Sequence, residues 1–197
     1  MKRPTLGCLA APAMRWLLLA LSLAPAAPAD EARPVLLALK QGSLSYTVVH
    51  KLHQVTGTTR ELEGVARLQP GGPTQVQVRA RVATFDSGNS NRDAHMREAT
   101  HEPLHPVAEV KGTLPPVTLP LAAPQELTMD ARVELNGIQQ KHVIPIRLEP
   151  SGARGVRGKF SFPISLDAFH VERPELLLIK IEDRAVIAGD LLFEARE

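Results

Sequence analysis

The chain has 197 residues, of which 44% are hydrophobic, 4% are aromatic and one is cysteine. This length fits one domain of ordinary size, and a single cysteine excludes a small scaffold stapled by disulfides. The 23 basic and 21 acidic residues leave a net charge of +2, which excludes the strongly basic balance typical of proteins that bind nucleic acid.

The N-terminus has the pattern of an export signal. Residues 1–29 hold three basic residues and no acidic residue. The apolar run Trp16–Ala24 is too short to span a bilayer comfortably, and Ala27-Pro28-Ala29 forms an A-x-A cleavage site. We therefore expect a signal peptide over residues 1–29, a single domain over residues 30–197, and a periplasmic or secreted location. Met14 begins a more ordinary signal by itself, so the true start codon stays open.

Removal of this leader changes the charge of the chain. Residues 30–197 carry 20 basic residues (23 − 3) against 21 acidic residues, a net charge of −1. The single cysteine, Cys8, leaves with the leader, so the domain has no disulfide and relies on its core and strand pairing. No second apolar run reaches transmembrane length, which predicts a soluble domain that does not span a membrane. Nothing in this balance predicts a nucleic-acid partner.

Alternating apolar and polar residues predict strands in the first half of the domain. Ser43–His50 and Thr59–Leu68 both alternate in this way. The pattern is clearest in Thr74–Thr84, whose apolar members are Val76, Val78, Ala80 and Val82. Successive side chains of a strand point to opposite faces, so these four share one dry face.

A cluster of Asp, Ser, Gly and Asn residues after this strand favours a turn and a helix start. Ser90 or Asn91 is expected to cap a short helix that carries Asp93 in its first turn. Val107–Gly112 then predicts a short strand, and the proline-rich stretch Pro115–Pro124 predicts an edge or a connection.

Glu126–Leu148 predicts a β-hairpin, because apolar residues alternate in both of its arms. Asn136-Gly137 lies between the arms and supplies two residues that accept positive φ, as a type I′ turn requires. Pro145 in the return arm cannot donate to a strand ladder, so its position should face an edge or a bulge.

The C-terminal part continues the pattern. Phe160–Leu166, Leu176–Ile181 and Ala185–Phe193 predict strands, with a corner over Asp167–Pro174. Roughly eight to ten short strands with one short helix predict a sandwich or a barrel. Pairing of the first strand with the last would close a barrel and remove both edges.

Several of these stretches, in this order and spacing, resemble the YceI-like family of exported lipocalin-like barrels. The resemblance spans about residues 40–194. The stretches that carry it are Ser45–His50, Gly57, Glu63-Gly64, Phe85–Gly88, Asn91–Met96, Pro106–Gly112, Leu127-Thr128, Asn136-Gly137 and Phe160–Arg173.

The resemblance implies an all-β fold, a closed antiparallel lipocalin-like barrel of about eight strands with one short helix. It also implies an apolar pore that holds a polyisoprenoid chain, such as an isoprenoid quinone. No cofactor is expected.

The apolar faces of the predicted strands are the candidate ligand site. The expected lining residues are Tyr46, Val48, Val76, Val78, Val82, Met129, Val133, Ile144, Ile146, Phe160, Phe162 and Ile164. The small residues Ala66, Ala80 and Ala131 leave room among them. The same side chains could instead fill the barrel, since a barrel of eight strands can do either.

The histidines predict no metal site. His50 and His53 are three apart on a strand and point to opposite faces unless the chain bends there. His101 and His105 can meet only if their proline-rich loop folds back. We expect solvated histidines and no bound metal.

No catalytic pair is predicted either. Asp93 and His95 are two apart on the expected helix and do not face each other. Arg92 with Asp93 is expected to anchor, by hydrogen bonds, the polar corner that precedes this helix. The chain also lacks the sequence motifs of serine hydrolases, zinc proteases and phosphate-binding loops, so an enzyme is the weakest class.

Two functions remain. The first is an exported binding protein that holds or carries a long apolar lipid, of the polyisoprenoid or isoprenoid quinone type, in the barrel. The alternative is a non-enzymatic envelope stress or interaction module with a filled barrel that acts through its surface. The sequence leaves open the identity of the lipid, the protein partners and the formation of a homodimer.

Overall fold

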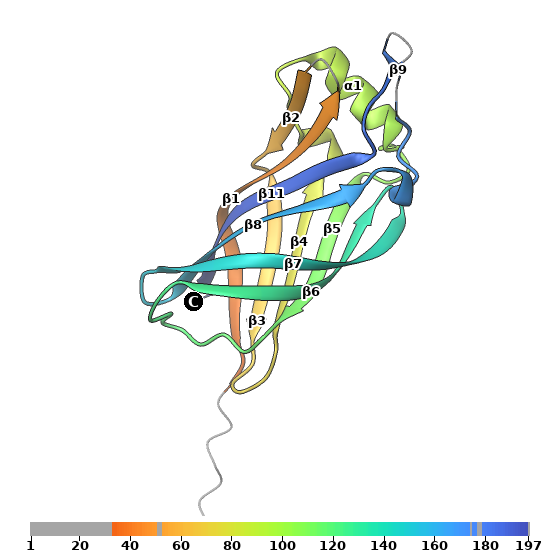
Figure 1. Cartoon of the computed structure of the whole chain (residues 1–197). Coiled ribbons are helices and arrows are strands. Elements are labelled where there is room, and N and C mark those ends of the chain that lie inside the picture. The colour runs from red at the N-terminus through yellow and green to blue at the C-terminus, as the bar shows by residue number, and fades with distance from the viewer. Residues whose placement is uncertain (1–32, 51–52, 174, 177–178, 197) are drawn as a thin grey trace, which may run out of the picture. The chain divides into compact units, whose positions relative to one another are not determined.

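The computed structural model describes residues 33–50, 53–173, 175–176 and 179–196. These residues form one compact unit, in which strands make up most of the described chain (Figure 1). The expected signal peptide lies outside the described residues, so export stays a prediction.

Among the described residues, nine strands form one sheet and two more form a small separate sheet. The large sheet contains β1 (Val35–His50), β2 (His53–Thr59), β3 (Leu62–Leu68), β4 (Thr74–Arg81), β5 (Val107–Leu114), β6 (Gln125–Leu135), β7 (Ile138–Ser151), β8 (Gly155–Ser165) and β11 (Arg184–Ala195). The small sheet contains β9 (Glu175–Leu176) and β10 (Ile179–Lys180). The helices are α1 (Ser90–Ala99) and two 3-10 turns, η1 (Val82–Thr84) and η2 (Asp167–Phe169).

The large sheet closes on itself through β1. Its strand order is β11-β8-β7-β6-β5-β4-β3-β1-β2, and β1 also pairs with β11 along most of its length. Both β2 and β3 pair with β1, at opposite ends of that long strand, so they act as two halves of one bent strand. The result is the closed antiparallel barrel of eight strands that the sequence predicted.

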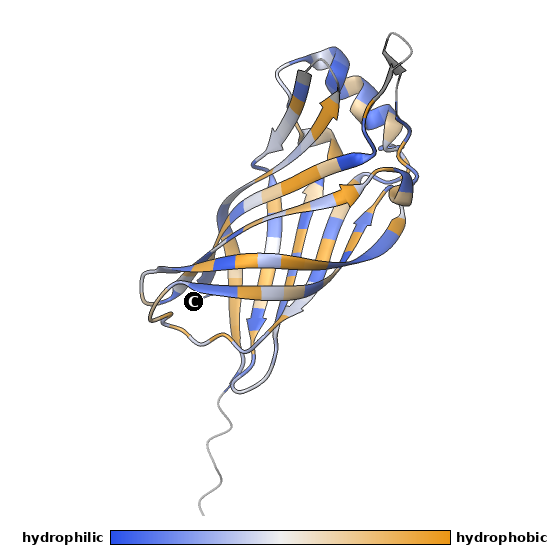
Figure 2. Cartoon of the chain, in the orientation of Figure 1, coloured by the Kyte–Doolittle hydropathy of each residue, from blue (hydrophilic) through white to orange (hydrophobic). Residues whose placement is uncertain are grey.

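The apolar core lies inside this barrel because the strands alternate. In β6, Met129, Ala131 and Val133 are buried, whereas Asp130 and Arg132 between them are exposed. Figure 2 shows apolar and polar residues alternating along the strands. Period-two alternation therefore separates a dry inner face from a wet outer face around the whole sheet.

The predicted strand over Thr74–Thr84 was wrong at its end. Val82–Thr84 is the 3-10 turn η1, in which the Phe85 amide donates to the Val82 carbonyl. The Thr84 hydroxyl also donates to the Arg81 carbonyl at 2.8 Å, a local bond that competes with strand pairing. Val82 itself is only 2% exposed, so its predicted burial holds although its secondary structure does not.

The predicted cap of the helix was wrong by one residue. Asn89 caps α1, and its side-chain oxygen accepts hydrogen bonds from the amides of Asn91 and Arg92, each at 3.1 Å. Asn89 has the extended backbone that a cap needs, whereas Ser90 is already helical. The expected place of Asp93 in the first turn is confirmed.

The β6–β7 hairpin has the turn that was predicted. Asn136 has φ of 52° and Gly137 has φ of 72°, so both residues adopt the positive φ of the expected turn. Pro145 lies opposite Thr128 of β6, while the ladder from β7 to β8 begins only at Ile146. Pro145 therefore has no ladder partner on its β8 side, which confirms that its position faces an edge.

We predict that Gly137→Val destabilises the barrel by about 1 kcal/mol or more, because a β-branched residue resists positive φ. A Cβ at this position would also come 2.5 Å from the His105 ring. Gly152 has φ of 69° with open space around it, so Gly152→Val is the matched control for backbone strain alone. Denaturant unfolding should show a larger loss for Gly137→Val than for Gly152→Val. Equal losses would mean that the His105 contact does not matter.

Candidate ligand cavity

The barrel encloses a cavity of about 550 Å³. All twelve residues expected to line the interior lie on its wall: Tyr46, Val48, Val76, Val78, Val82, Met129, Val133, Ile144, Ile146, Phe160, Phe162 and Ile164. This placement makes them available to a ligand, and their contact with one stays a prediction.

The sequence missed several wall residues, most clearly on β1. Leu37 and Leu44 both line the cavity although they are seven apart and should face opposite sides of a regular strand. A register shift between Leu39 and Gln41 reverses the alternation between them. A bulge of this kind leaves no clear signal in the sequence, so the period-two alternation assigns residues beyond it to the wrong face.

One end of the cavity is closed by the connector between β5 and β6. Val117 and Leu121 from this proline-rich segment are each 5% exposed and belong to the apolar core. The amide of Val117 donates to the hydroxyl of Thr74 at 3.2 Å, which ties the connector to the start of β4. The Thr74 hydroxyl is thereby satisfied, and this end of the cavity has an apolar floor.

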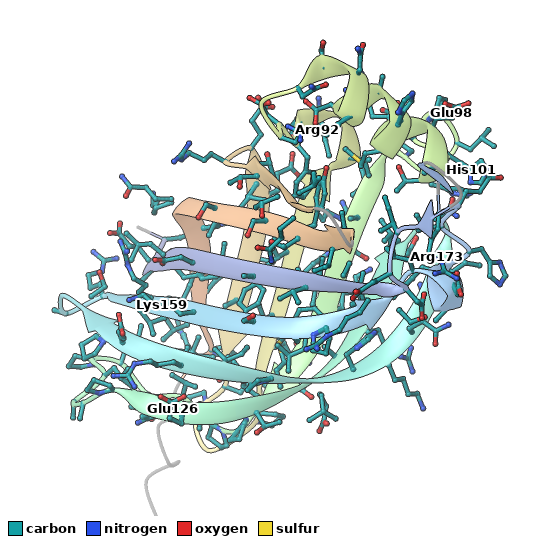
Figure 3. All side chains as sticks on the ribbon, turned by 45° about the horizontal axis from the view of Figure 1, so that its top comes forward. Arg92, Glu98, His101, Glu126, Lys159 and Arg173 are labelled. Atoms are coloured by element: carbon teal, nitrogen blue, oxygen red, sulfur yellow. The ribbon has the colours of Figure 1, made fainter. Side chains whose placement is uncertain are left out.

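Several polar groups of the wall lie at the other end, beside α1. Arg92 and His95 of α1 line the cavity there, together with Arg173 from the segment before β9. Figure 3 shows Arg92 and Arg173 at this end of the barrel. Arg173 forms two bonds to the Asp167 carboxylate, at 2.7 and 2.8 Å, and therefore has a structural role in the corner. Arg92 donates one N–H to the Ser87 carbonyl, so its other N–H groups and the His95 ring can meet a ligand.

Tyr46 adds a phenol to the same end. Its ring packs against Phe85, with the ring centroids 5.6 Å apart. Burial and then the nearby Asp93 carboxylate raise the pKa of Tyr46 to about 12, although the Arg92 guanidinium opposes part of the rise. The hydroxyl therefore stays protonated at physiological pH and can donate a hydrogen bond.

Glycines allow the largest wall side chains to lie along the wall. Tyr46 lies over Gly57, its partner across the β1–β2 ladder, where an added Cβ would come 2.5 Å from the ring. Phe160 lies over Gly189 in the same way, across the β8–β11 ladder. Because each ring occupies the space above a glycine, it does not extend across the pore. This packing leaves the cavity open.

Asn136 fixes the corner that borders the cavity. Its side-chain amide donates to the carbonyls of Phe169 and His170, at 3.1 and 3.0 Å. Since both amide hydrogens are used, its oxygen accepts from the Nδ1–H of His101 at 3.0 Å. One buried side chain thus joins the β6–β7 turn, the η2 corner and the segment after α1.

The YceI-like domain family matches residues 37–193 of this chain. The chain belongs to the YceI-like family. No curated protein matches the chain significantly.

Several solved structures share the fold. A polyisoprenoid binding domain from Saccharophagus degradans is 16% identical with a TM-score of 0.67, and the match covers 82% of this chain and 99% of that one. BcnA from Burkholderia cenocepacia is 16% identical with a TM-score of 0.64, over 77% and 95% of the two chains. The YceI protein of Campylobacter jejuni is 12% identical with a TM-score of 0.55, over 76% and 89%.

In this YceI-like barrel, Arg92 and Asp93 have the anchoring role that was expected. Arg92 donates to the Ser87 carbonyl at 3.1 Å, and the buried Asp93 carboxylate accepts from the Ser87 amide at 3.0 Å. His95 lies on the cavity wall, while the Asp93 carboxylate is bonded to Ser87 in the polar corner before α1.

The histidine pairs are brought closer than the sequence suggested. His50 and His53 are partners across the β1–β2 ladder, although their side chains lie outside what the structure describes. The loop after α1 folds back, since the His105 amide donates to the His101 carbonyl at 3.0 Å. His101 then bonds Asn136, and His105 packs against Gly137. Among the described residues, no group of three His, Cys, Asp or Glu is arranged to hold a metal ion.

We predict that Asn136→Gly lowers the free energy of unfolding by about 2 kcal/mol, because it keeps a residue that accepts positive φ but removes three hydrogen bonds. His101→Ala removes only one of the three and should cost about 0.5–1.5 kcal/mol. Urea unfolding of both variants measures the difference. If Asn136→Gly is as stable as the unmodified protein, this side chain does not hold the corner.

Proposed function

We propose that this YceI-like protein is an exported binding protein that holds or carries a long apolar lipid, of the polyisoprenoid or isoprenoid quinone type, in its barrel. The observation that carries this proposal is the cavity of about 550 Å³ with a wall built almost wholly of hydrocarbon side chains. Transfer of an apolar chain from water into such a pocket is favourable in proportion to the apolar area buried.

The two ends of the cavity indicate an amphiphile. The apolar floor beside Val117 suits a hydrocarbon tail, whereas Tyr46 and Arg92 at the α1 end offer hydrogen-bond donors. A lipid with a polar head that accepts hydrogen bonds would therefore bind with its tail toward the connector and its head beside α1. A hydrocarbon without a head group would give the Tyr46 hydroxyl no acceptor from the ligand, at a cost in affinity.

The comparisons support the same class of ligand. The Saccharophagus degradans neighbour is described as a polyisoprenoid binding domain, and its fold matches most of this chain. At 16% identity this similarity shows a shared fold and no more. We propose the same class of ligand for this chain because its own cavity is apolar.

The alternative function, a surface-acting module with a filled barrel, fits the interior less well. Tyr46 and Phe160 could fill the pore, but both lie over cross-strand glycines instead. We propose binding without catalysis, because hydrocarbon dominates the cavity wall and favours burial of a lipid over chemistry on it.

We predict that Val78→Phe expels the lipid, because Val78 faces the cavity and is 8% exposed. Gly189→Ala should act in the same direction by pushing the Phe160 ring into the pore. Co-purified lipid is measured by solvent extraction and mass spectrometry, and the melting temperature is taken on the same preparation. In an open pore, the apo form of either variant should melt close to the apo form of the unmodified protein.

Val143→Phe is the matched control, since Val143 lies on the outer face and is 68% exposed. It should retain the lipid. A filled barrel gives a different result: the unmodified protein carries no lipid, and Val78→Phe overpacks the core at a cost of about 1–3 kcal/mol. That outcome would contradict the proposed function.

Export is proposed on the basis of the leader alone. We predict that mature protein from the cell envelope or medium begins near Asp30, after the Ala27-Pro28-Ala29 site. N-terminal sequencing tests this directly. A mature protein that keeps Trp16 would show that the leader is not removed.

A further inference from the structure

A row of three cations crosses the outer face of the barrel. Lys111 of β5 lies directly opposite Arg132 of β6, and Arg132 lies directly opposite Lys141 of β7. All three side chains are exposed. We call these three residues the cationic row.

Like charges that face each other across neighbouring strands destabilise a sheet. Elsewhere on this outer face the conflict is resolved by a carboxylate. Arg147 and Lys159 also face each other across β7 and β8, but Glu149 binds both of them, at 3.1 and 2.8 Å. In the cationic row, by contrast, no single carboxylate of the described residues pairs with two neighbouring members.

Lys111 is the member of the cationic row with a carboxylate partner, Glu109. Glu109 also accepts hydrogen bonds from Arg79 and Gln77. Burial opposes the charge of this carboxylate, but the bonds from Lys111, Arg79 and Gln77 together outweigh it and lower the pKa of Glu109 to about 2. The oxygens of Glu109 are thus occupied by these three partners, and its carboxylate remains ionised at any physiological pH.

Arg132 and Lys141 are different. Within the described part of the chain, neither has a carboxylate oxygen within the 4.0 Å of an ion pair. Asp130 and Glu134 flank Arg132 along β6, but Glu134 accepts from Gln139 instead. Two neighbouring cations are therefore left facing solvent and each other.

The cationic row borders a groove on the outer face. The groove is lined by four cations, Arg67, Lys111, Arg132 and Lys141, and by one carboxylate, Asp130. The charged lining residues therefore give a local excess of three positive charges (4 − 1). This excess lies on a domain whose overall charge is −1 over residues 30–197. The positive potential is therefore local to this groove and is not a property of the whole surface.

We propose that this groove binds a phosphate-bearing ligand, with Arg132 at its centre and Lys111 and Lys141 on either side. A guanidinium presents paired N–H donors that match two phosphate oxygens, while lysines add point charges. Residues directly opposite across strands are about 5 Å apart, so one phosphate can reach Arg132 and a neighbouring lysine together. The anion supplies the negative charge that no carboxylate of the described residues brings to Arg132 and Lys141.

Lys111, Arg132 and Lys141 do not line the lipid cavity, and strand alternation places all three side chains on the outer face. The proposal is therefore independent of the proposed lipid function. The phosphate could belong to a soluble polyphosphate or to the head group of an anionic lipid, and the experiment separates these two sources.

The first arm titrates inorganic tripolyphosphate into the purified protein at low salt and follows binding by calorimetry. Arg132→Gln/Lys141→Gln should bind about tenfold more weakly or not at all, because the two cations without carboxylates are removed. Its melting temperature should be unchanged or higher, since the like-charge contact is also removed. Binding by the unmodified protein should weaken as salt is added.

The matched control is Arg157→Gln/Lys159→Gln, which removes the same charge from β8 (Lys159 is labelled in Figure 3). Both of these cations have carboxylate partners. It should bind tripolyphosphate as the unmodified protein does. Equal losses in the two double variants would show a general charge effect and overturn the site.

The second arm measures sedimentation with phosphatidylcholine vesicles, with and without phosphatidylglycerol. Binding to the anionic vesicles that is lost in Arg132→Gln/Lys141→Gln identifies a lipid head group as the source. Binding to tripolyphosphate alone identifies a soluble phosphate compound. Binding to neither probe, or binding that the double variant retains, overturns the proposal.

Discussion

The pairing of β1 with β11 is the constraint on which the structure depends. It joins the first and last strands of the described chain from Leu37–Ala195 to Val48–Ala185. Without this ladder both strands would be open edges, and the inner face of the sheet would be exposed to water along its length. Closure is what converts alternating side chains into an enclosed apolar space, so the cavity is a product of long-range pairing. The polar end of the cavity beside α1, and its apolar floor at the connector between β5 and β6, are then added by segments between the strands.

Much of the fold and of the cavity wall could be predicted from the sequence because period-two alternation is a local signal. Val76, Val78, Met129 and Val133 all lie on the cavity wall where parity placed them. The Asn136-Gly137 turn was also predictable, since few other residue pairs accept positive φ at both positions.

The features that the sequence did not reveal depend on contacts between distant segments or on a break in the alternation. The bulge after Leu39 reverses the parity of β1, and no residue type announces it. The hydrogen bonds of Asn136 to Phe169, His170 and His101 join three segments that are far apart in the chain. The cationic row is likewise invisible until the register places Arg132 beside Lys111 and Lys141, because net charge averages over the whole surface.

The alternation alone could not decide between an open pore and a filled barrel, since both need the same apolar residues on the inner face. The decision depends on what lies opposite each large side chain. Tyr46 faces Gly57 and Phe160 faces Gly189 across their ladders, and Met129 extends over Gly112, where an added Cβ would come 2.7 Å from its Cγ. Each glycine accepts a side chain that would otherwise point into the pore, so the apolar volume of the inner face is spread along the wall. An alanine at such a position would displace its partner into the cavity by a distance comparable to a methyl group. The capacity of this barrel for a lipid is therefore set by its small inner residues as much as by its hydrophobic ones.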